Sequence, residues 1–122
     1  MPGYNAGDAA PPAPKAVWAD QWGAIVIDDT SGDVGVSSSK SSKSDAVRAA
    51  THDCEARGAS RCSVALTYYN QCAALAWGDG ARGTANNPSE TEAKADALKS
   101  CKEGASGCKV VYSACSAPIR VQ

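Results

Sequence analysis

Six cysteines, arranged as two sets of three in similar surroundings, constrain this chain of 122 residues more than any other feature. The first set lies in DCEARGASRCSVALTYYNQC, residues 53–72, and the second in SCKEGASGCKVVYSAC, residues 100–115. Each set has a cysteine, a polar run with Gly-Ala-Ser, a second cysteine, an alternating apolar run and a third cysteine. The repetition predicts two copies of one structural unit.

An even number of cysteines in a short chain is typical of a disulfide framework in an oxidising compartment. The chain has no Phe, and Ala supplies much of its apolar content, so a thin core needs covalent support. Zinc is the competing interpretation, but neither set contains a close Cys-x2-Cys pair, and His52 is the only histidine. We therefore expect three disulfides, no metal and no cofactor.

Beyond the cysteines, the repeat predicts strands and helices in the order ββαβ, twice. QWGAIVID at 21–28 is matched by CAALAWGD at 72–79, and weaker second strands follow in DVGVSSS and ARGTANN. The capping-box spacings of Ser42 with Asp45 and of Ser89 with Glu92 then predict two helix starts.

Each predicted helix has a stripe of small side chains that ends in a cysteine. The stripes are Ala46, Ala50 and Cys54, then Ala93, Ala97 and Cys101. Residues at i, i+4 and i+8 share one helix face, so each helix can lie close to a sheet.

The strand after each helix alternates cleanly, and we expect its apolar face to meet the helix. These faces comprise Cys62, Val64, Leu66 and Tyr68, then Cys108, Val110, Tyr112 and Ala114. The expected fold is an α+β domain in which two ββαβ repeats form one antiparallel six-stranded sheet, with both helices on one face and approximate two-fold symmetry.

The repeat symmetry also suggests how the cysteines pair. A cysteine at each helix end and one at the start of the next strand are placed to bond, which pairs Cys54 with Cys62 and Cys101 with Cys108. Cys72 opens the fourth strand and Cys115 closes the sixth, so we pair these if the two strands are antiparallel neighbours. Six cysteines allow 15 pairings, and symmetry is what selects this one.

Composition divides the chain into a tether and one domain. Residues 1–16 are rich in Pro, Ala and Gly and are expected to form a flexible tether, whereas residues 17–122 form a single domain with repeats at about 20–71 and 72–116. The cysteines require export although the N-terminus lacks signal-peptide architecture, so we expect that a signal peptide has been removed. The location expected is periplasmic or secreted.

Charge and hydropathy exclude two classes of partner. The formal net charge is −1, and basic and acidic residues are interleaved along both predicted helices, so we expect no nucleic-acid binding. No apolar run approaches the ~20 residues that span a bilayer.

Catalytic groups are scarce. The cysteines are committed to disulfides, and His52 is expected on an exposed helix face, so no base stands beside a nucleophile. Asp28, Asp29 and Asp33 surround a DDTSGD turn, for which turn formation is the simplest explanation. Gly78, Gly80 and Gly83 lack the context of a phosphate-binding loop and predict a hairpin. We therefore expect that the chain is not an enzyme.

A binding surface is the remaining possibility. Alternation places Tyr68 and Tyr112 inward and Tyr69 outward, and an outward Tyr is a plausible contact residue. The acidic turn of Asp28, Asp29 and Asp33 is suited to a basic partner. Packing and a solvated hairpin tip are the structural alternatives for these four residues, which are our candidates for partner binding.

The segments WGAIVID, DCEARG followed by RC, YYNQCAALAWGD and VVYSACS resemble an exported bacterial family known as domain of unknown function 4189, over residues 22–116. The resemblance implies an exported, disulfide-bonded protein with no assigned enzymatic activity. Members with similar YYNQC and YSACS segments occur in bacteria that kill competitors through contact-dependent secretion. In such bacteria, small periplasmic proteins encoded beside toxin genes act as immunity proteins.

Three classes of function remain open. The first is a periplasmic immunity or inhibitor protein that neutralises a toxin, delivered by a type IV or type VI secretion system, through stoichiometric binding. The second is a secreted factor that acts on another cell. The third is a cell-envelope hydrolase, for which no catalytic constellation can be assembled.

Overall fold

The computed structural model describes residues 16–122, so the predicted tether lies outside the described residues except for Ala16. Within these residues two helices and eight strands follow one another. They are β1 (Trp18–Ala19), β2 (Trp22–Asp28), β3 (Asp33–Lys40), α1 (Lys43–Ala56), β4 (Ser63–Tyr69), β5 (Cys72–Asp79), β6 (Arg82–Asn87), α2 (Glu90–Lys102), β7 (Ser106–Cys115) and β8 (Ile119–Arg120). The order ββαβ occurs twice, as β2-β3-α1-β4 and β5-β6-α2-β7.

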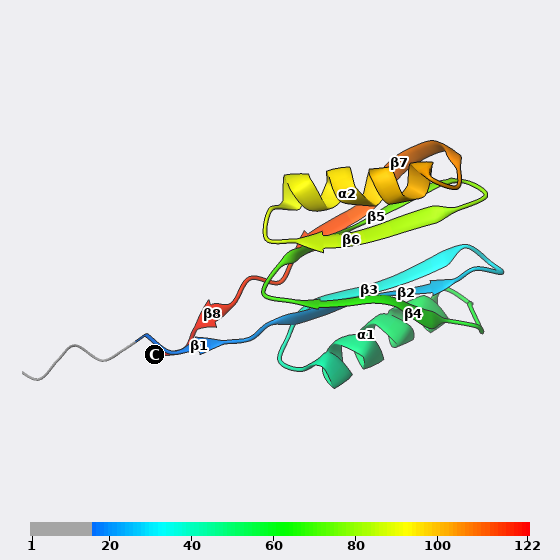
Figure 1. Cartoon of the computed structure of the whole chain (residues 1–122). Coiled ribbons are helices and arrows are strands. Elements are labelled where there is room, and N and C mark those ends of the chain that lie inside the picture. The colour runs from blue at the N-terminus through cyan, green and yellow to red at the C-terminus, as the bar shows by residue number, and fades with distance from the viewer. Residues whose placement is uncertain (1–15) are drawn as a thin grey trace, which may run out of the picture.

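The six long strands form two antiparallel three-stranded sheets, ordered β3-β2-β4 and β6-β5-β7, and not the single six-stranded sheet predicted. The sheets stack face to face, with α1 outside the first and α2 outside the second (Figure 1). The prediction that both helices cover one face is therefore wrong. β4 contacts β6 and β3 contacts β7, so each contact joins an edge strand of one repeat to the last strand of the other.

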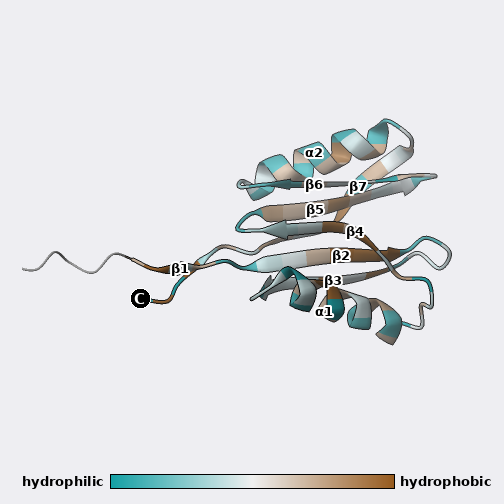
Figure 2. Ribbon diagram, turned by 60° about the horizontal axis from the view of Figure 1, so that its bottom comes forward, coloured by the Kyte–Doolittle hydropathy of each residue, from teal (hydrophilic) through white to brown (hydrophobic). Residues whose placement is uncertain are grey.

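The central strands explain why the sheets stack. In β2, Ala24 and Val26 pack against α1, while Ile25 and Ile27 pack between the sheets with Leu75 of β5, and all five are fully buried. Figure 2 shows the hydrophobic residues along β2 and β5, which lie inside the stack. A nearly continuous apolar strand is typical of a sheet covered on both faces. Neither sheet therefore keeps a free face.

A β-bulge in the last strand of each repeat corrects a second expectation. In β4, Val64 pairs with Val26 but Leu66 pairs with Ile25, and β7 shows an equivalent shift between Val110 and Tyr112. The extra residue switches the strand from the helix side to the space between the sheets. Tyr68 and Tyr112 consequently pack between the sheets and do not meet the helices.

Both helices begin at the predicted caps and lie close to a sheet. The Ser42 hydroxyl accepts a hydrogen bond from the Asp45 N–H at 3.1 Å, and the Ser89 hydroxyl accepts one from the Glu92 N–H at 3.3 Å. Beneath the helices, a Cβ on Gly35 would collide with the carbonyl oxygen of Ala50, and one on Gly83 with that of Ala97. Glycine at these two positions permits the close approach.

Three disulfides join the predicted pairs. Cys54 is bonded to Cys62 and Cys101 to Cys108, each connecting a helix to the strand that follows it. Cys72 is bonded to Cys115, its register partner across β5 and β7. Repeat symmetry was therefore a sufficient guide to connectivity.

Candidate functional site

Asp28, the first of the predicted contact residues, ends β2 and anchors the loops around it. Its side chain is 2% exposed. Oδ1 accepts hydrogen bonds from the N–H groups of Thr30 and Ser31, and Oδ2 accepts them from those of Ser60 and Arg61. The Arg61 N–H lowers the pKa of the Asp28 carboxyl most strongly; burial opposes it and the other N–H groups add to it. Asp28 is therefore not at the surface.

Asp29 and Asp33 remain accessible on the same turn. The Asp29 side chain is 66% exposed, and its Oδ2 lies 3.4 Å from Nη2 of Arg82 on β6. Asp33 is half-buried, and its Oδ2 accepts a hydrogen bond from the Ser31 hydroxyl at 2.9 Å. The acidic turn therefore presents two carboxylates, one of which contacts the other repeat.

The contact between Asp29 and Arg82 borders a cleft of about 390 Å³ at the hairpin-tip end of the molecule. We call this the tip cleft; it is lined by Asp29, Trp77, Gly80, Ala81 and Arg82. Trp77 and Arg82 are cross-strand neighbours on β5 and β6. The Arg82 guanidinium lies 6.0 Å from the centroid of the Trp77 ring, within the range of a cation–π contact.

Arg82 has an unusual electrostatic environment. Among the side-chain nitrogen and oxygen atoms of residues 16–122, its Nε is the one that is buried without a hydrogen-bond partner. Leaving a buried donor unpaired costs about 1–3 kcal/mol, and more for a charged group. The Arg82 side chain is 30% exposed, so a partner could reach the guanidinium at its accessible atoms and not at Nε.

The repeats differ at this place. Ile27 and Val34 form the cross-strand pair of the first repeat that corresponds to Trp77 and Arg82 in the second. Ile27, Val34 and Trp77 all pack in the core between the sheets, whereas Arg82, at the position of Val34, lines the tip cleft together with Trp77. Aligning the two repeats exposes this substitution in the sequence, but we had interpreted GDGARG only as a hairpin and had not selected Trp77 or Arg82.

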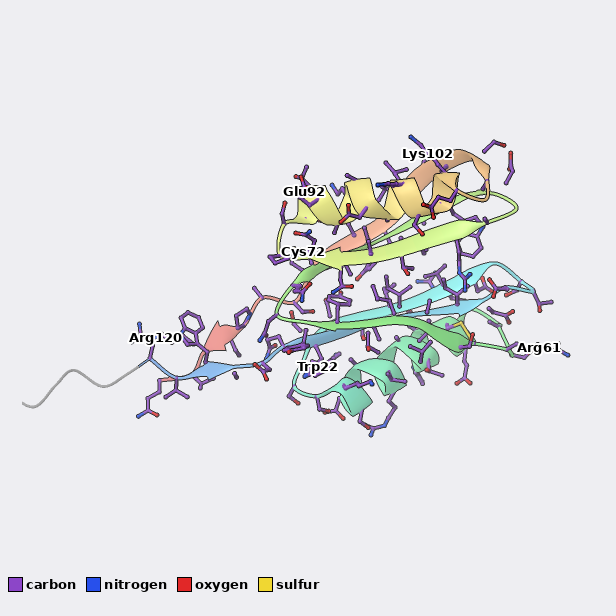
Figure 3. All side chains as sticks on the ribbon, viewed as in Figure 1. Trp22, Arg61, Cys72, Glu92, Lys102 and Arg120 are labelled. Carbon is purple, nitrogen blue, oxygen red and sulfur yellow. A yellow bond between two sulfur atoms is a disulfide. The ribbon has the colours of Figure 1, made fainter. Side chains whose placement is uncertain are left out.

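Tyr69, the fourth predicted contact residue, lies at the opposite end of the first sheet. It is 47% exposed and stacks on Trp22, with ring centroids 4.6 Å apart. Trp22 begins β2 and Asp28 ends it, a separation of about 20 Å for seven extended residues. Figure 3 shows Trp22 and Arg61, whose N–H binds Asp28, at opposite ends of the first sheet. The four predicted residues therefore do not form one patch.

The ends of the described chain form a second exposed surface, which we did not predict. β1 and β8 pair as a two-stranded ribbon that projects beyond the sheets (Figure 1). Its exposed apolar side chains are Val17, Trp18, Ile119 and Val121, at 44–58% exposure. The register places Val17, Ala19, Ile119 and Val121 on one face of the ribbon.

The side chains that could take part in catalysis or metal binding are His52, the cysteines, the acidic residues and the buried tyrosines. His52 is exposed on α1, and all six cysteines are in disulfides. Within residues 16–122 no group of three His, Cys, Asp or Glu side chains is placed to hold a metal ion. Burial raises the pKa values of Tyr68 and Tyr112, and the proximity of Tyr68 raises that of Tyr112 further, so both hydroxyls stay protonated at neutral pH.

No helix in the described part of the chain is long and apolar enough to cross a membrane. The three disulfides are consistent with an extracellular or periplasmic protein.

Comparisons with known proteins give one match. The family model described as a domain of unknown function (DUF4189) matches residues 22–115, which includes both repeats. No curated protein and no solved structure matches the chain.

Proposed function

Because the chain belongs to the DUF4189 family, whose description assigns no activity, we propose its function from its own surface. The protein is a periplasmic immunity or inhibitor protein that neutralises a bacterial toxin by stoichiometric binding, with no catalytic step. The toxin is an effector of a type IV or type VI secretion system, a partner class suggested by the family resemblance.

The observation that carries this proposal is the state of Arg82. Its guanidinium lies against Trp77, its Nε is buried without an acceptor, and one of its terminal nitrogens is near the exposed Asp29. Trp and Arg are the residue types most often responsible for binding energy at protein interfaces. A partner oxygen in the tip cleft would bind the exposed part of the guanidinium, which the ion pair with the exposed Asp29 leaves accessible to solvent.

The framework around the tip cleft is suited to binding with little loss of conformational entropy. The Cys101–Cys108 disulfide lies beside it. Gly78, which follows the cleft residue Trp77, packs so closely against this disulfide that an added Cβ would collide with Cys108 Sγ and with the backbone of Ser106. The Asp28 hydrogen bonds hold the adjacent turn. A preorganised surface keeps more of its contact energy as affinity.

Asp29 and Asp33 provide charge at the rim. Exposed interfacial charges mainly affect the association rate, whereas buried anchors mainly affect dissociation. We therefore assign the acidic pair to steering of a basic region of the partner, and Trp77 and Arg82 to retention of the complex.

The proposal is tested by titrating the purified protein against the toxin encoded beside its gene and measuring the remaining toxin activity. Inhibition should saturate near one equivalent for the native protein, and Arg82→Val should weaken it at least tenfold. His52→Ala, the matched surface control, should inhibit like the native protein. Inhibition at strongly substoichiometric amounts, or none at all, would refute the binding proposal.

A further inference from the structure

The edges of the two sheets leave a groove on each side of the stack, and each groove has a volume of about 320 Å³. The β3–β7 groove is lined by Gly32, Asp33, Val34, Val36, Arg57, Leu75, Val111 and Tyr112. The β4–β6 groove is lined by Val64, Ala65, Arg82, Gly83, Thr84 and Ser100. Corresponding strands of the two repeats form the two grooves, so each groove can be compared with the other.

In the β3–β7 groove the strand edge is capped. The N–H of Val36 points away from β2 and donates a hydrogen bond to Oδ2 of Asp53 at 3.0 Å. Asp53 lies on α1 immediately before Cys54, where it also forms an ion pair with Arg57. A carboxylate bound to an outward N–H prevents another strand from pairing at that point of the edge.

In the β4–β6 groove the corresponding edge is open. Thr84 pairs with Leu75 in the same way as Val36 pairs with Ile25. The N–H of Thr84 therefore points away from β5, as the N–H of Val36 points away from β2. Ser100 precedes Cys101 as Asp53 precedes Cys54, and no described residue accepts a hydrogen bond from the Thr84 N–H.

The position of the helix does not explain the difference. A Cβ on Gly83 would collide with the carbonyl oxygen of Ala97, as one on Gly35 would collide with that of Ala50, so both helices approach their strands equally closely. The open edge therefore results from having serine in place of aspartate.

Two further features of the β4–β6 groove concern what would occupy it. Val64 and Ala65 of β4 line the opposite wall, and Val64 is 49% exposed. Arg82 lines both this groove and the tip cleft, and its Nε lacks an acceptor. An extended backbone is complementary to an open strand edge, and a carboxylate is complementary to a guanidinium.

We propose that the β4–β6 groove binds an extended peptide segment of a partner protein as an additional strand on β6, with a carboxylate of that segment at Arg82. This inference rests on the proposed function, because it specifies how a partner reaches Arg82. Asp29 is then the resident carboxylate that the peptide carboxylate replaces or joins.

Hydrogen exchange of the free protein tests the premise. The amide of Thr84 should exchange much faster than that of Val36, because only the latter is capped. Equal protection of the two amides would overturn the inference.

The binding test uses random heptapeptides displayed with a free C-terminus, followed by fluorescence polarisation of an enriched peptide and of its C-terminal amide. Ser100→Asp reproduces the cap of the first repeat and should weaken peptide binding at least tenfold, Ser100→Ala should weaken it far less because it adds no carboxylate, and His52→Ala, outside the groove, should bind like the native protein. Arg82→Val should weaken binding of the free acid more than that of the amide. Thr84→Pro, which removes the outward N–H without removing a ladder hydrogen bond, should act like Ser100→Asp.

The inference is overturned if no peptide is enriched, if Ser100→Asp binds like the native protein while its melting transition is unchanged, or if sedimentation shows that β6 pairs with a second copy instead. Toxin titration separates this failure from failure of the proposed function. If Ser100→Asp still inhibits at one equivalent but Arg82→Val does not, the strand-addition model is wrong and the inhibitor proposal stands. If the native protein does not inhibit, the inhibitor proposal fails whatever the peptides show.

Discussion

Trp22 and Tyr69 stack at the place in the first repeat where the second repeat has a disulfide. Trp22 is the register partner of Tyr69 across β2 and β4, as Cys72 is of Cys115 across β5 and β7. Both pairs join the start of a central strand to the end of the repeat's last strand. An aromatic contact thus holds one repeat at the point where a covalent bond holds the other.

Tyr69→Ala should lower the free energy of unfolding by about 1–2 kcal/mol, because it removes a stacked pair worth roughly 0.5–1.5 kcal/mol together with some buried area. Tyr69→Phe keeps the stack and should remain within about 0.5 kcal/mol of the native protein. Urea unfolding of the two variants measures the difference. A Tyr69→Ala variant as stable as the native protein would show that the stack contributes nothing, and would leave Tyr69 available for a partner.

Replacing Cys72 and Cys115 with Ala should cost more than replacing Cys54 and Cys62. The first bond closes a sequence separation of 43 and the second a separation of 8. On the chain-entropy model these loops correspond to about 4 and about 2.5 kcal/mol. Denaturant unfolding of the two double variants gives the order, and a larger loss for the Cys54 and Cys62 pair would contradict this explanation.

Asp28→Asn should destabilise the protein at neutral pH and reduce its sensitivity to acid. The folded-state pKa of Asp28 lies below the ordinary value of 3.8, so its stabilising effect is complete above that pH and is lost as the pH falls through the folded-state pKa. Melting temperatures of the two proteins should therefore differ at pH 7 and converge below pH 3.8. Asp29→Asn, at an exposed carboxylate, is the control; a constant difference at all pH values would exclude Asp28 as the titrating group.

Local features of the fold were predictable because they depend on neighbouring residues. The caps at Ser42 and Ser89 and the order ββαβ follow from short-range patterns that the structure reproduces. The disulfide pairs followed from the repeat.

The number of layers depends on whether the central strands are covered on one face or on both. All four residues from Ala24 to Ile27 are buried, so both faces of β2 are covered. A strand with one exposed face would instead alternate apolar and polar residues. The bulge beside Ala65 cannot be recognised from alternation, because the residues on both sides of it are apolar. Once the sheets stack, the solvent-exposed face that a single six-stranded sheet would have opposite its helices does not exist.

The candidate site was only partly predictable for the same reason. The acidic turn was visible, but its contact with Arg82 requires the hairpins of the two repeats to meet across the stack. The burial of Asp28 depends on N–H groups from a loop more than thirty residues further along the chain.

Gly35→Ala and Gly83→Ala should each destabilise the protein by about 2 kcal/mol or more. The added Cβ would meet helix backbone, which cannot rotate away, and overpacking of this kind typically costs 1–3 kcal/mol. Gly104→Ala is the control, since its Cβ would lie 3.3 Å from Ala81 Cβ at the surface. Thermal unfolding measures all three; unchanged stability in Gly35→Ala would mean that α1 lies further from β3 than described.

Arg82→Val should separate stability from binding. The change gives the second repeat the residue type that Val34 provides in the first, and it removes a buried donor whose desolvation costs about 1–3 kcal/mol. It also removes an ion pair with an exposed partner, worth about 0–1 kcal/mol, and a cation–π contact worth about 0.5–1 kcal/mol. Because these effects oppose one another, the free energy of unfolding should stay within about 1 kcal/mol of the native value.

The same variant should lose at least tenfold in affinity for the partner. The loss should come mainly from faster dissociation, because the Arg82 side chain that anchors the complex is removed, whereas the charges of Asp29 and Asp33 that steer association remain. Urea unfolding and surface plasmon resonance on one preparation give both quantities. A loss of several kcal/mol in stability would identify Arg82 as a structural residue, and unchanged affinity would exclude the tip cleft as the binding surface. If Arg82 contributes to partner binding and not to folding, the Arg82→Val protein should fold with near-native stability and dissociate faster from its partner.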